Sequence, residues 1–176
     1  LRASYRGGFL GKAVAYGNRQ SEIPAARIHS LRWHPVRLLS SLESPYYYGA
    51  KKKYLDWIAA RQLATGRYDM FHSWSGDCLL SLREAHKRGI PSVLEIPTWH
   101  RDRGKLKSGQ TTTDGTKSDL PWRKRWKEDL LLDRERYLEE YDLANLILVL
   151  SQKAAETFRV QGFPEEKLFY LPRGVD

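Results

Sequence analysis

Three segments of the sequence place polar or aromatic side chains directly after an apolar run. They are Ser73-Trp74-Ser75, Pro97-Thr98-Trp99-His100 and Ser151. A histidine that follows a strand and precedes a basic segment is placed where a ligand cleft can form. We therefore predict that His100 is a catalytic residue. The alternative is a histidine on the surface, or one that lies behind the residues that contact a ligand.

A glycine pair, Gly7-Gly8, precedes a predicted helix from Phe9 to about Arg19. The first turn of a helix presents backbone N–H groups and the positive end of the helix dipole, which together bind phosphate groups. Gly7 and Gly8 are therefore the predicted phosphate-binding residues. Paired glycines are also common in turns, so a flexible turn is the alternative.

Helical and extended patterns alternate from residue 46 onward, which is typical of an α/β domain with a parallel sheet. The predicted strands cover residues 26–31, 68–73, 90–96, 143–150 and 167–171, and the run 143–150 is expected to be central and buried on both faces. The predicted helices lie around residues 54–63, from Ser75 to Gly89, from Asp119 to about Leu143, and from Ser151 to Gly162. Residues 68–73 are expected to form a short buried strand, and residues 33–45 a loop.

Parallel strands end at a common edge of their sheet, where ligands of such folds bind. We therefore expect Gly7-Gly8, Ser73 and His100 to converge on one lip of a crevice. Glu95 lies within the apolar run Val93-Leu94-Glu95-Ile96. If it is buried it needs a partner, for which Arg101 or Arg103 is expected; an outward-facing position is the alternative. His72, within a strand, is expected to be structural.

The order of several short motifs resembles the N-terminal domain of glycosyltransferase family 4. The motifs are Gly7-Gly8, Tyr68-Asp69, Arg88-Gly89-Ile90-Pro91, Tyr141-Asp142-Leu143-Ala144 and Pro172-Arg173-Gly174-Val175-Asp176. The resemblance implies one half of a GT-B enzyme: a Rossmann-like, doubly wound parallel sheet with helices on both faces. Residues 1–176 would form this single domain, and residues 172–176 would begin the linker to a C-terminal Rossmann-like domain that the sequence lacks.

The resemblance implies a retaining glycosyltransferase that moves a sugar from a nucleotide-diphosphate sugar to the hydroxyl of a saccharide or lipid-linked acceptor. The nucleotide sugar is a co-substrate, and this domain is expected to hold no cofactor of its own. The residues expected at the substrate and acceptor cleft are Arg6, Ser73, Trp74, Ser75, Trp99, Arg101, Ser151 and Arg173. Most ligands of the nucleotide sugar in this family lie in the second domain. We therefore expect residues 1–176 to fold but to transfer nothing alone.

The formal net charge of +9 is concentrated in two segments. Residues 1–40 carry seven basic side chains against one acidic, and residues 101–127 carry nine against three. Such segments attract anions, whether the phosphates of a nucleotide sugar, an acidic membrane surface or nucleic acid.

Residues 97–121 are a predicted long basic loop, followed by Trp122-Arg123-Lys124-Arg125-Trp126-Lys127. This stretch is a solvated helix start, a patch that binds anionic membrane headgroups, or a nucleic-acid site. The last is disfavoured because no recognised nucleic-acid motif accompanies it. The alternative to an enzyme is therefore a non-enzymatic basic module that binds an anionic membrane or nucleic acid through residues 101–127.

The remaining composition bears on metal binding and location. The five histidines and the single cysteine, Cys78, show no metal-ligand spacing, so no metal site is predicted. A lone cysteine is compatible with a reducing compartment, and no apolar run approaches the roughly 20 residues of a membrane span. We expect a cytoplasmic protein, either soluble or peripheral on the inner face of the membrane.

Overall fold

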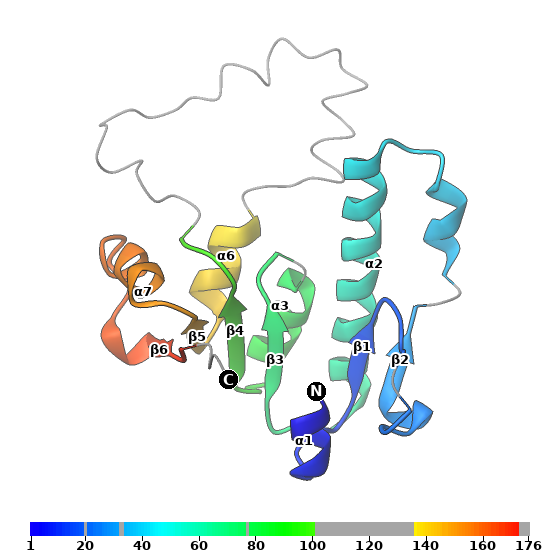
Figure 1. Cartoon of the computed structure of the whole chain (residues 1–176), viewed down its shortest axis with the longest axis horizontal. Helices are drawn as coiled ribbons and strands as arrows, with labels where there is room; N and C mark the ends of the chain where they lie inside the picture. The colour runs from blue at the N-terminus through cyan, green and yellow to red at the C-terminus, as the bar shows by residue number, and fades with distance from the viewer. Residues whose placement is uncertain (20, 32–33, 77, 101–135, 173–176) are drawn as a thin grey trace.

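The strands that follow residue 70 form one parallel sheet. The computed structural model describes residues 1–19, 21–31, 34–76, 78–100 and 136–172. Strands β3 (Phe71–Trp74), β4 (Ser92–Ile96), β5 (Leu146–Val149) and β6 (Leu168–Tyr170) pair in that order, all parallel. Helices α3 (Leu79–Lys87), α6 (Arg136–Leu143) and α7 (Gln152–Arg159) alternate with them along the chain (Figure 1). This is the predicted Rossmann-like α/β fold, a parallel sheet flanked by helices.

The hydrophobic core lies between one face of this sheet and the three helices. Alternate strand residues point to opposite faces, and those on the inner face are almost completely buried: Leu94, Ile96, Ile147 and Val149. They form one cluster with side chains from α3, α6 and α7, among which Phe158 is the largest that is fully buried. The apolar pattern of the strands therefore determines which face the helices cover.

The opposite face of the sheet is more open. Leu146 and Leu148 of β5 are only half-buried, so the expectation that this strand is buried on both faces is correct for its inner-face residues alone. The strand predicted at residues 68–73 is also less buried than expected, with His72 and Trp74 exposed. The reason is that β3 is an edge strand of the four-stranded sheet, with a neighbour on one side only.

The first 31 residues differ from the predicted order of elements. A short helix, α1 (Arg2–Arg6), precedes strand β1 (Ala13–Ala15), which pairs in parallel with β2 (Ile28–Ser30) after the 3-10 turn η1 (Ala25–Arg27). The strand predicted at residues 26–31 is confirmed, but the helix predicted from Phe9 to Arg19 is wrong. Gly11 and Gly17 weaken a helix there, and pairing of β1 with β2 satisfies its backbone instead.

The longest of the helices that the structure describes, α2 (Ser44–Thr65), confirms the helix predicted around residues 54–63 and begins ten residues earlier than that pattern. Its start and a 3-10 turn, η2 (Pro35–Leu39), occupy much of the predicted loop 33–45. Gly66 ends α2 as predicted, and glycine is required at this position because a Cβ would lie 2.3 Å from the Tyr68 ring. Packing of α2 against α3, η2 and β1 joins the two sheets (Figure 1).

The later helix boundaries follow the sequence closely. Ser151 caps α7, since its hydroxyl accepts a hydrogen bond from the Ala154 N–H at 3.0 Å, as predicted. Helix α6 ends at Leu143, as expected, while the predicted start of that helix lies outside the described residues. The last strand, β6, falls within the predicted range 167–171.

Candidate functional site

The carboxyl ends of β3, β4 and β5 meet at one edge of the sheet. Trp74, the last residue of β3, is level with Glu95 of β4, and Ile96 is level with Val149 of β5. The segments that leave these strands are therefore neighbours: the turn at Ser75-Gly76, the segment Pro97–His100 and the cap Ser151. The structure thus brings together three of the segments in which the sequence placed candidate site residues.

Two tryptophans at this edge present their side chains to solvent. Trp74 is 55 % exposed and Trp99, three residues beyond β4, is 45 % exposed. A flat indole can contact the apolar C–H face of a sugar ring while its N–H donates a hydrogen bond. The hydroxyls predicted nearby are engaged within the protein, because Ser75 donates to Glu140 and Ser151 caps α7. Ser73 lies on the half-buried side of β3, with its hydroxyl donating to the Trp74 carbonyl oxygen.

Glu140 of α6 holds the turn that follows Trp74, and it is not among the residues predicted from the sequence. Its carboxylate accepts hydrogen bonds from the Ser75 hydroxyl at 3.1 Å, the Gly76 N–H at 2.6 Å and the Cys78 N–H at 3.2 Å. Burial raises the pKa of Glu140, and the nearby charge of Asp56 adds to this, while the three hydrogen bonds oppose it. Glu140 lies four residues before the buried Ala144 and therefore on the same face of α6. A carboxylate on the buried face of a helix is a signal that could have identified this residue.

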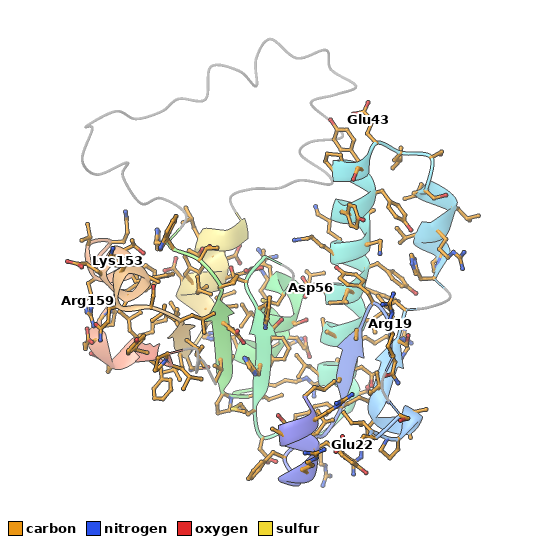
Figure 2. All side chains as sticks on the ribbon, in the orientation of Figure 1. Arg19, Glu22, Glu43, Asp56, Lys153 and Arg159 are labelled. Carbon is orange, nitrogen blue, oxygen red and sulfur yellow. The ribbon has the colours of Figure 1, made fainter. Side chains whose placement is uncertain are left out.

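A second buried carboxylate, Asp56 of α2, caps α3. It accepts hydrogen bonds from the Leu80 N–H at 2.8 Å and from the N–H and hydroxyl of Ser81 at 2.9 and 2.7 Å. Ser75, the predicted cap of this helix, does not cap it, since α3 begins at Leu79. The N-terminus of α3 is thus bound by carboxylates of this chain, which take the place that an anionic ligand would occupy. Figure 2 shows Asp56 between α2 and α3.

The catalytic prediction for His100 does not agree with the structure. Its imidazole is 4 % exposed and lies among the rings of Tyr141, Phe158 and Phe163, with centroids 4.8–5.6 Å away. Its backbone N–H donates to the Thr157 hydroxyl. Aromatic side chains from α6, from α7 and from the segment after α7 cover the position, so the ring belongs to the core beneath the sheet edge and is withdrawn from solvent.

The phosphate-binding prediction for Gly7 and Gly8 has lost its structural basis. The pair follows the C-terminal end of α1 and opens no helix, so it presents no helix N-terminus to an anion. A Cβ at Gly11 would lie 3.2 Å from the Tyr68 ring, which precedes β3. Helix α1 accordingly lies near the amino end of β3 (Figure 1), and the expected convergence of Gly7-Gly8 with Ser73 and His100 is wrong.

Arg6, expected in the substrate cleft, lies on α1 at this same distant end. Its guanidinium forms a two-point ion pair with Glu22, with nitrogen–oxygen distances of 2.5 and 3.1 Å. The hydrogen bond from Arg6 lowers the pKa of Glu22. Figure 2 shows Glu22 beside α1. The two charges satisfy each other on the surface, away from the carboxyl edge.

Glu95 has a partner on the neighbouring strand. The His72 Nε2 lies 3.4 Å from the Glu95 Oε2, on the more open face of the sheet. The expected partners, Arg101 and Arg103, lie outside the described residues, as do Arg173 and the basic segment 101–127. The residues of the alternative, a basic binding module, therefore lie outside the described part of the chain.

The described ranges show neither a metal-ligand cluster nor a membrane-spanning helix. Across them, no three His, Cys, Asp or Glu side chains are grouped as metal ligands. Among the helices that the structure describes, none combines the length and apolarity that a membrane span requires.

Comparison with known proteins identifies the family. The model of Glycosyltransferase Family 4 matches residues 13–176, nearly the whole chain. No curated protein and no solved structure matches it. The family match agrees with the parallel sheet and with the motifs noted in the sequence. The chain belongs to glycosyltransferase family 4.

Proposed function

We propose that this chain forms the acceptor-side half of a retaining glycosyltransferase. The reaction moves a sugar from a nucleotide-diphosphate sugar to a hydroxyl of a saccharide or lipid-linked acceptor. The family match over residues 13–176 is the observation that carries the proposal. Retention and the use of a nucleotide sugar are what the family resemblance implies.

The carboxyl edge of β3 and β4 is the proposed acceptor platform. Ligands of parallel α/β sheets bind outside this edge, and it is the edge at which Trp74 and Trp99 are exposed. Indole rings stack on sugar rings and restrict their orientation, which brings an acceptor hydroxyl close to a donor held opposite. The donor would be held by a second Rossmann-like domain that faces this edge.

The second domain would also supply most of the catalytic groups. Departure of a nucleoside diphosphate creates negative charge, and preorganised donors that stabilise such charge are usually the largest catalytic contribution. In this family those groups lie mainly in the second domain. We therefore propose that residues 1–176 alone bind acceptor and transfer no sugar.

Proton NMR of the reaction catalysed by the full-length protein tests the proposal. Incubation with a panel of nucleotide-diphosphate sugars and saccharide or lipid-linked acceptors should yield a glycoside with the anomeric configuration of the donor. Residues 1–176 alone should yield none. A product with the inverted anomeric configuration would overturn retention. Sugar transfer by residues 1–176 alone would overturn the proposal that a second domain supplies most of the catalytic groups.

A further inference from the structure

One carboxylate binds the turn at the carboxyl end of β3 to helix α6. Glu140 is 1 % exposed, and all three of its described hydrogen-bond donors lie in or just after the turn at Ser75-Gly76, on Ser75, Gly76 and Cys78. This turn begins at the residue after Trp74. Gly76 within it has φ +99°, a backbone conformation that side-chain-bearing residues rarely adopt. The path of the turn therefore depends on the contacts that hold it.

A purely stabilising role does not need a charge at this position. Burying a carboxylate carries a desolvation cost, and an apolar side chain of similar size is often as stabilising or more so. The carboxylate instead fixes the position of the turn relative to α6, because it accepts hydrogen bonds from three donors at once. Because Ser75 and Gly76 directly follow Trp74, these hydrogen bonds fix the backbone immediately after that residue.

Asp56 provides an internal comparison. It is also a buried carboxylate, 2 % exposed, and it also binds the N-terminal region of α3. Its donors, however, are Leu80 and Ser81, which lie within the helix. Asp56 therefore anchors the body of α3 to α2, whereas Glu140 anchors the turn that carries the chain away from Trp74.

We propose that Glu140 is a positioning residue for the acceptor site, which fixes the turn at Ser75-Gly76 and through it the orientation of Trp74. This inference rests on the proposed function, because it assigns the positioned tryptophan to acceptor binding. It predicts that loss of the carboxylate weakens acceptor binding specifically. The donor site and the chemical step, which this turn does not form, are unaffected.

Steady-state kinetics of the full-length protein, with acceptor and donor varied separately, test the inference. The variants are Glu140→Gln, the matched control Asp56→Asn, and Trp74→Ala. Replacing the carboxylate by an amide puts an NH2 group against an N–H donor, so at least one charge-assisted hydrogen bond is lost. The acceptor KM should then rise about tenfold in Glu140→Gln, with kcat and the donor KM unchanged. Asp56→Asn should leave the acceptor KM unchanged.

The outcomes separate the inference from the proposed function. If Trp74→Ala raises the acceptor KM and Glu140→Gln does not, the positioning role is overturned while the acceptor platform stands. Equal increases in Glu140→Gln and Asp56→Asn would likewise overturn it, because a general loss of stability would explain both. If Trp74→Ala leaves the acceptor KM unchanged, the acceptor platform itself is wrong. If Glu140→Gln does not fold, Glu140→Asp, which withdraws the charge by one methylene, serves for the same comparison.

Discussion

Asp56 Oδ1 lies 2.7 Å from the hydroxyl and 2.9 Å from the N–H of Ser81, a residue 25 positions later in the chain. This contact joins α2 to α3, the first helix that packs on the parallel sheet. Together with Glu140, it means that the N-terminal region of α3 is bound by side chains from both α2 and α6. Helix α2 thus holds the body of α3, whereas α6 holds the turn that follows β3.

The Asp56 contact should contribute strongly to stability. Asp56→Ala leaves the Leu80 and Ser81 N–H groups without their acceptor in a buried position, which should lower the free energy of unfolding by about 2–3 kcal/mol. Urea denaturation followed by circular dichroism measures this. Glu165→Ala is the control, because its ion pair with Arg159 is exposed, and such pairs contribute about 0–1 kcal/mol. Equal losses in the two variants would contradict the capping role.

Glu140 should make stability depend on pH. Its pKa in the folded protein is raised above the ordinary value of 4.5, so the folded state holds this proton more tightly than the unfolded state. Its contribution to stability is therefore present below pH 4.5 and is lost as pH rises through the folded pKa. The free energy of unfolding of the wild type, relative to Glu140→Gln, should fall over this range in urea titrations at a series of pH values. A relative stability that grows with pH would contradict the direction of the shift.

Phe158 should be the most sensitive position of the core. Its side chain is completely buried and contacts the rings of His100, Tyr141 and Phe163. Phe158→Ala should reduce the free energy of unfolding by about 3–5 kcal/mol, through lost burial and the cavity that remains. Phe169→Ala, at a half-exposed position on β6, should cost far less. Thermal unfolding of both variants provides the comparison, and a similar loss in both would show that the core lies elsewhere.

His100 should prove structural. His100→Phe retains an aromatic ring within the aromatic cluster and leaves the backbone bond to Thr157 in place. We expect kcat of the full-length protein to change less than about fivefold, whereas loss of a general acid or base costs roughly a hundredfold or more. A loss of that larger size in a correctly folded variant would restore His100 to the catalytic site.

Much of the fold was predictable because its signals are local. The alternation of helical and extended patterns identified the parallel sheet, and Ser151 was recognised as a helix cap from its place before an apolar stripe. The N-terminal region was harder to predict. The run Ala13–Ala15 is short and flanked by glycines, and its strand conformation comes from pairing with Ile28–Ser30, a partner that no local pattern reveals.

The site was predicted less well than the fold, for a related reason. The expectation that polar residues after strands meet at one edge follows from parallel pairing alone, and it holds for Trp74, Trp99 and Ser151. Whether a side chain there faces solvent depends on what packs over it. The rings of Tyr141 and Phe158 cover His100, and the Glu140 carboxylate engages Ser75. Both are tertiary contacts between residues 40 or more positions apart.

The acceptor KM of Trp74→Ala, compared with that of Trp57→Ala, tests the account most directly. Both tryptophans are about half exposed, but Trp57 lies on α2, where it stacks on Tyr54. Loss of a stacking indole should raise the acceptor KM roughly tenfold for Trp74→Ala, while Trp57→Ala leaves it unchanged. An acceptor KM that is the same in Trp74→Ala and in the wild type would contradict an acceptor platform at the carboxyl edge of β3.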